Sequence, residues 1–137
     1  MKTLFFFFLW SSVALADAPF PGPSELAMEV NKVRAAHGLY ELTQVEPLIC
    51  AANRHAKDLA QTLDCSHEGS DGSTWQSRAK DCGTRVKAEI LACGYGQAVN
   101  VIKRWMNDKM SKAILLDDDA QAMGTAKVDD VWILLIK

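Results

Sequence analysis

The end of the chain carries the pattern that most limits its fold. Residues 131–136 read VWILLI, an almost continuous apolar run. A half-exposed strand alternates polar and apolar residues, so this continuity indicates a strand buried on both faces. Helices must then cover both sides of its sheet, which predicts an α+β fold with α/β/α layers. A strand is expected at 122–128, and Asp129-Asp130 is short enough to turn a hairpin, which makes the small sheet mostly antiparallel.

Helical spacing of apolar residues predicts longer elements earlier in the chain. One helix follows the N-cap candidate Ser24 and ends near Gly38. A second is opened by Pro47 at a first-turn position, and a third covers residues 97–108. His55 falls on the apolar face of the second helix, where a hydrogen-bonded core residue is expected more often than a ligand.

Two shorter elements are expected in the middle of the chain. Ser73 and Gln76 have the spacing of a capping box for a short helix that runs to about residue 81. Over residues 84–92 the period changes to two, which predicts a strand with Glu89 on its more polar face.

The first residues have the form of an export signal. Residues 1–16 combine a positive start, a short apolar run and a small-x-small site, which predicts a signal peptide cleaved at about Ala16/Asp17. The apolar run is too short to cross a bilayer, so we expect no transmembrane segment. Residues 17–23 form a proline-rich leader and 24–137 a single domain. The protein is therefore predicted to be secreted, to the exterior or the periplasm.

Export affects the interpretation of the four cysteines, because an oxidising compartment favours two disulfides. A helix between Cys50 and Cys65 separates them by roughly 20 Å, and a strand separates Cys82 from Cys93 by roughly 25 Å. Neither gap can be bridged. Cys50–Cys93 with Cys65–Cys82 and Cys50–Cys82 with Cys65–Cys93 remain open, and we favour the first.

The charge composition argues against a nucleic-acid partner. The formal net charge is −2 and no run of lysine or arginine occurs. A nucleic-acid partner is therefore not expected. We expect a monomer, given one small domain.

Short motifs spread over nearly the whole mature chain resemble the CAP superfamily: cysteine-rich secretory proteins, antigen 5 and pathogenesis-related proteins, which share an SCP-like domain. The likeness is to small bacterial-type secreted members, whose fold is an α/β/α sandwich. The matching positions are Asn31 and Arg34, Ala51-Ala52 with His55 and Asp58, the segment SHEGSDGS with Arg78, Glu89, and Trp105-Met106-Asn107.

The resemblance implies a central cleft that usually has two histidines and two acidic residues. His67 matches the first histidine, Glu89 the strand acid, and Asp108 stands where the second acid is expected. Ser111 occupies the position of the second histidine, so that part of the pattern is degenerate. No cofactor is expected, although His67 and Glu89 are candidate ligands for a weakly held divalent metal such as zinc.

The resemblance favours a non-enzymatic extracellular binding module. Its ligand would be a small apolar molecule, such as a sterol or fatty acid, or a cell-envelope partner. Enzymatic activity is left open, with its absence favoured; the alternative is a protease-like or metal-assisted hydrolase centred on His67 and Glu89. A structural or interaction domain with a degenerate cleft is the second alternative.

Overall fold

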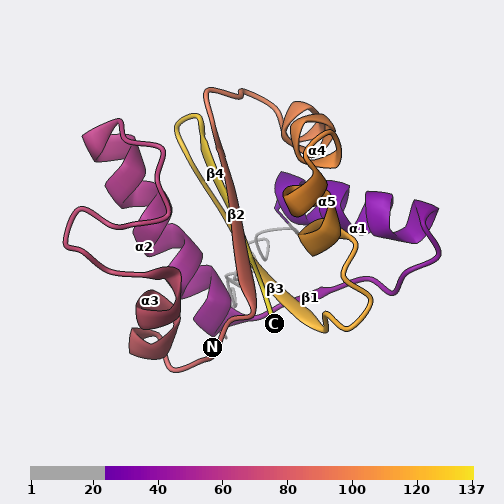
Figure 1. Ribbon diagram of the computed structural model, residues 1–137, viewed down its shortest axis with the longest axis horizontal. Helices are drawn as coiled ribbons and strands as arrows, with labels where there is room; N and C mark the ends of the chain where they lie inside the picture. Colours follow the sequence, from indigo (N-terminus) through magenta and orange to yellow (C-terminus); the bar gives the residue numbers. More distant parts are fainter. Residues whose placement is uncertain (1–23) are drawn as a thin grey trace, which may run out of the picture.

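The computed structural model describes residues 24–137, so the predicted signal peptide and leader lie outside the described residues. These residues form five helices and four strands (Figure 1). In chain order they are α1 (Glu25–Ala36), β1 (Thr43–Gln44), α2 (Glu46–Thr62), α3 (Trp75–Asp81), β2 (Ala88–Cys93), α4 (Ala98–Met106), α5 (Lys109–Leu115), β3 (Ala122–Val128) and β4 (Val131–Ile136).

The four strands form one sheet in the order β1-β3-β4-β2. β4 pairs antiparallel with β2 and β3, whereas the two-residue β1 adds in parallel to β3. The predicted hairpin is confirmed, since β3 and β4 are joined at Asp129-Asp130. β2 lies at one edge of the sheet.

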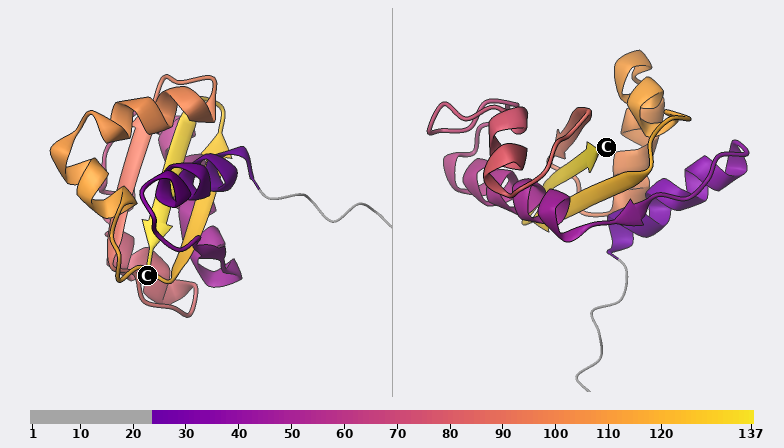
Figure 2. Two further views of the ribbon diagram at one scale, coloured as in Figure 1. Left: turned by 90° about the vertical axis from the view of Figure 1, so that its right-hand side faces the viewer. Right: turned by 90° about the horizontal axis from the view of Figure 1, so that it is seen from below.

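Both faces of β4 are buried, which confirms the expectation from its continuous apolar run. Trp132, Leu134 and Ile136 pack with α1, α4 and α5, whereas Ile133 and Leu135 pack with α2 and α3. The views in Figures 1 and 2 show these two groups of helices on opposite sides of the sheet. The predicted α/β/α layering is therefore correct.

One glycine sets the distance between α2 and the sheet. A Cβ added at Gly124 of β3 would lie 2.2 Å from the carbonyl carbon of Leu48 and 2.5 Å from the amide nitrogen of Ile49. Because backbone atoms occupy that space, only glycine allows α2 to approach β3 so closely. This contact holds α2 and the loop that follows it against the sheet.

The ends of the helices agree in part with the sequence. Ser24 caps α1 by accepting the amide of Ala27, and Pro47 lies in the first turn of α2, as predicted. The capping box of α3 is formed by Thr74 and Ser77, so the predicted pair Ser73 and Gln76 is wrong by one residue.

Two other boundaries differ from the prediction. Ser73 does not cap α3 because its carbonyl and hydroxyl oxygens accept hydrogen bonds from the Arg78 guanidinium. The helix predicted over 97–108 ends at Met106, and Asp108 then caps a separate helix, α5. Among the described helices, none has both the length and the apolar character that a bilayer crossing requires.

The disulfides pair Cys50 with Cys82 and Cys65 with Cys93. The pairing that we favoured from the sequence is therefore wrong, and the one left open beside it is correct. The reason is the packing of α3 against α2. This packing brings Cys82, at the end of α3, to Cys50 in the first turns of α2, while Cys65 follows α2 and meets the end of β2.

Candidate functional site

A buried carboxylate lies on β2, an edge strand of the sheet. Glu89 of β2 has a side chain that is 1% exposed. Its Oε1 lies 2.8 Å from Nδ1 of His67, in the loop after α2. Its Oε2 accepts a hydrogen bond of 3.0 Å from the guanidinium of Arg78 in α3. The carboxylate is therefore neutralised by Arg78 and orients the imidazole of His67.

Arg78 also holds the loop that contains His67. Its guanidinium donates to the carbonyl oxygens of His67, at 3.0 Å, and Ser73, at 2.9 Å. The residue is 2% exposed, so its charge needs these partners. Sequence reasoning noted Arg78 as part of a motif but did not identify this role. The motif's spacing alone gives no indication that the arginine points back under the loop.

His55 supports the same loop from inside the protein. It is fully buried, and its Nε2 lies 2.7 Å from the carbonyl oxygen of Ser66, so Nε2 carries the proton and donates. Burial lowers the pKa of His55, and the nearby Glu89 carboxylate only partly offsets that effect. Its Nδ1 has no hydrogen-bond partner among the described residues. His55 is thus a neutral core residue, as its apolar helix face suggested.

The arrangement orients one imidazole nitrogen outward. Because the Glu89 carboxylate can only accept, Nδ1 of His67 donates to it and Nε2 keeps its lone pair. The His67 side chain is 58% exposed. Such a nitrogen can accept a hydrogen bond or a proton from a bound molecule.

The donor set does not fit a divalent metal. Both Glu89 oxygens are occupied, one by His67 and one by the positive Arg78. Only Nε2 of His67 remains, whereas zinc requires several nitrogen, sulfur or carboxylate donors.

Asp108 and Ser111 lie together, but in a different part of the structure from Glu89. Asp108 caps α5, and its Oδ2 accepts the Ser111 amide at 2.9 Å. Hydrogen bonds from the backbone and side chain of Ser111 lower the pKa of Asp108. Within residues 24–137, no hydrogen bond or ion pair joins this pair to His67 and Glu89. The four residues that sequence reasoning grouped therefore form two separate pairs.

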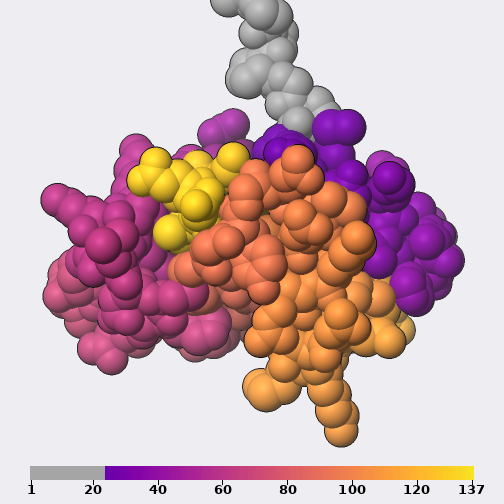
Figure 3. Space-filling model, turned by 90° about the horizontal axis from the view of Figure 1, so that it is seen from above, coloured from indigo at the N-terminus to yellow at the C-terminus, as the bar shows by residue number. Residues whose placement is uncertain are grey.

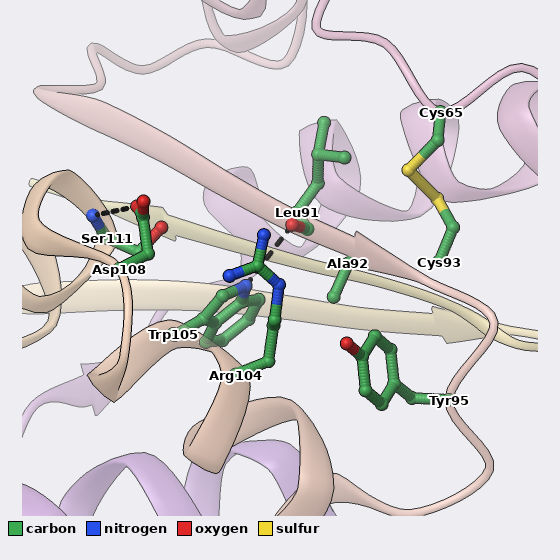
Figure 4. A pocket seen from close by; sticks show the side chains of 9 residues that line it. All are labelled: Cys65, Leu91, Ala92, Cys93, Tyr95, Arg104, Trp105, Asp108 and Ser111. Atoms are coloured by element: carbon green, nitrogen blue, oxygen red, sulfur yellow. Dashed lines mark hydrogen bonds between the residues drawn. A yellow bond between two sulfur atoms is a disulfide. The ribbon is translucent and has the colours of Figure 1, made fainter.

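A cleft of about 340 Å³ runs along the edge of β2. One wall has the Cys65–Cys93 disulfide and the other has Asp108 and Ser111 (Figure 4). In the space-filling view, the α4–α5 segment projects from the surface beside the part formed by α2 and α3 (Figure 3). The remaining lining residues are Leu91, Ala92, Tyr95, Arg104 and Trp105.

Arg104 and Tyr95 were not singled out from the sequence, and Trp105 was noted as part of a family motif. Trp105 is buried, and its indole Nε1 donates to the carbonyl oxygen of Leu91 on β2. Arg104 lies four residues before Asp108, and within the helix predicted over 97–108 that spacing would have placed the two on one side.

Comparison with known proteins gives a family match. The profile of the cysteine-rich secretory protein family, CAP, matches residues 28–130. No curated protein matches the chain significantly in sequence.

Solved structures show the same fold. An extracellular SCP-domain protein of Bacillus anthracis superposes with a TM-score of 0.76 at 19% identity, over 81% of this chain and 38% of that one. An outer surface protein of Borrelia burgdorferi superposes with a TM-score of 0.71 at 23% sequence identity, over 81% of this chain and 87% of that one. A cysteine-rich secretory protein of Staphylococcus aureus superposes with a TM-score of 0.66 at 19% sequence identity, over 81% of this chain and 36% of that one. The chain thus spans little more than a third of the Bacillus and Staphylococcus proteins.

Proposed function

The chain belongs to the CAP family of cysteine-rich secretory proteins, and on that premise we propose that it is a secreted, non-enzymatic binding module that holds its ligand in the cleft at the edge of β2. The cleft itself carries this proposal. Its walls are fixed by a disulfide on one side and by a buried tryptophan on the other. A preformed site of this kind loses little conformational entropy when a ligand binds.

The nature of the lining supports a ligand with both apolar and polar parts. Leu91, Tyr95 and Trp105 provide apolar surface, while Arg104 and Ser111 provide polar groups. The ligand is a small apolar molecule with a polar group, or part of a cell-envelope partner. Secretion is supported by the sequence of residues 1–16 and by the Bacillus structure, which is described as extracellular.

Binding is favoured over hydrolysis because the polar side chains serve internal contacts. Glu89 is held by Arg78 and His67, and Asp108 caps a helix. The outward nitrogen of His67 has no nucleophilic side chain bonded to it in the described part of the chain, as hydrolysis through a covalent intermediate requires.

Native mass spectrometry of the protein recovered from its export compartment tests this proposal. We expect a bound species whose mass is lost in Ser111→Phe, which fills the cleft. The matched variant Lys112→Phe adds the same bulk at an exposed neighbour outside the cleft and should retain the species. Protein without a bound species, or a species that both variants retain, would contradict binding in this cleft.

A further inference from the structure

The cleft exposes a backbone edge as well as side chains. Gly94 donates its amide to the carbonyl oxygen of Asp130, which fixes the phase of the β2–β4 ladder. In an antiparallel pair, hydrogen-bonded residues alternate with non-bonded ones. The N–H and C=O groups of Leu91 and Cys93 therefore point away from β4, toward the open edge. The hydrogen bond from Trp105 to the Leu91 carbonyl, on the cleft side, agrees with this phase.

Such an edge matches the backbone of another extended chain, because a row of outward amides and carbonyls is the template for strand addition. The small side chain of Ala92 leaves room above the edge. Figure 4 shows the Ala92 methyl group, the Tyr95 ring and the Arg104 guanidinium around the same space.

Arg104 gives the site a charge preference. The residue is exposed, and its guanidinium makes no hydrogen bond or ion pair of 4.0 Å or less with any residue of 24–137. Asp108, which interacts with Arg104 through its charge, is already bonded to Ser111. The cleft therefore presents a guanidinium that can pair with a carboxylate on a bound molecule.

We propose that the ligand is an extended peptide segment of a protein partner, an inference that rests on the proposed function. The segment adds as a short strand to the edge of β2 and directs an acidic side chain to Arg104. Side chains of an added strand alternate between the two faces of the sheet. The side chain beside Ala92 enters the cleft, on the side of Tyr95 and Arg104. The neighbouring backbone groups bond to the amide of Leu91 and to the amide and carbonyl of Cys93, because the Leu91 carbonyl already accepts from Trp105.

Binding of a synthetic peptide to the full secreted chain tests the charge preference. The probe is the blocked heptapeptide Thr-Val-Thr-Glu-Thr-Val-Thr, titrated by calorimetry. We expect Arg104→Glu to weaken its affinity by about tenfold or more, and a probe with lysine in place of glutamate to regain affinity for that variant. The matched variant Lys103→Glu, which lies outside the cleft, should bind the original probe nearly as wild type does. Equal losses in both variants would show a general charge effect and overturn the proposal.

Methylation of the probe's backbone tests strand addition independently of any protein variant. One isomer carries N-methyl groups on the two threonines beside glutamate, and the other carries them on the two valines. Only one set of amides faces β2, so one isomer should lose about tenfold in affinity while the other does not. Equal binding of the two isomers would overturn strand addition.

The two proposals fail separately. Native mass spectrometry could show a species that Ser111→Phe removes while neither the charge-swap titration nor the N-methylated isomers give the expected result. In that case the cleft binds a small molecule, and only the peptide inference falls. If no species is found and no peptide binds, both fall.

Discussion

At the scale of single residues, Arg78 and Glu89 depend on each other because both are almost fully buried. Their side chains are 2% and 1% exposed and lie 3.0 Å apart. Removing one partner of a buried ion pair leaves an uncompensated charge. We expect Arg78→Ala to lower the free energy of unfolding by about 3–5 kcal/mol in urea denaturation.

Arg54 provides the matched comparison for Arg78. It pairs with Asp71 and Asp81 in the same part of the fold, but all three side chains are well exposed. Solvent screens such pairs, so Arg54→Ala should change stability little. Similar losses in the two variants would mean that the ion pair between Arg78 and Glu89 is not energetically distinct.

His55 makes the stability of the fold depend on pH, and its burial determines the sign of that dependence. Desolvation lowers its pKa in the folded protein, so the unfolded chain binds the proton at higher pH than the folded chain does. We expect the contribution of His55 to the free energy of unfolding to be constant above about pH 6.5. Below that pH the free energy of unfolding should fall, by at most about 1.4 kcal/mol per pH unit. The loss stops below the folded-state pKa, where both states are protonated.

Urea denaturation at successive pH values measures this effect. His55→Gln should reduce the slope between about pH 6.5 and 4.5, above the range where most carboxyl groups titrate. His37 is exposed, so His37→Gln should leave the slope unchanged. A slope that is the same in wild type and His55→Gln would exclude the buried histidine as its source.

At the scale of elements, the contact between α2 and β3 depends on Gly124. A methyl group there would meet the backbone at Leu48 and Ile49, which cannot move aside as a flexible side chain does. We expect Gly124→Ala to lower the free energy of unfolding by about 1–3 kcal/mol or more, measured by chemical denaturation. Gly96→Ala is the control, since no heavy atom lies within 4 Å of its added Cβ. A neutral Gly124→Ala would show that α2 can shift without cost.

Periodicity predicted the elements that are long enough to show a period. The strands at 122–128 and 131–136 and the helix opened by Pro47 lie where expected. β1 was missed because two residues have no measurable period, and its position is set by pairing with β3. α5 was missed because only two capping residues, Asn107 and Asp108, separate it from the end of α4 at Met106. That boundary depends on a side-chain cap.

The candidate site was predictable only where strand geometry determined it. The period of two placed Glu89 on the polar face of its strand, and the structure brings His67 to it. The relation of Asp108 and Ser111 to that pair required the three-dimensional path of α4 and α5. The role of Arg104 depends on the edge position of β2, which pairing between distant strands decides.

At the scale of the whole molecule, the cleft separates the part formed by α2 and α3 from the part formed by α4 and α5. The two disulfides relate to these parts differently. Cys50–Cys82 lies within the first part, joining α2 to the end of α3. Cys65–Cys93 ties the loop that carries His67 to the end of β2, and it lines the cleft. The first should therefore affect stability alone, and the second both stability and binding.

Paired serine substitutions separate these roles. The residues joined are 32 and 28 apart in sequence. By chain entropy each bridge therefore contributes about 3–4 kcal/mol, and the melting temperatures of the two double variants should fall by similar amounts. At a temperature where both remain folded, only Cys65→Ser with Cys93→Ser should weaken binding of the glutamate heptapeptide, because only that bridge forms the cleft wall. Unchanged affinity in this variant would mean that the loop holds its position through Arg78 and His55 without the disulfide.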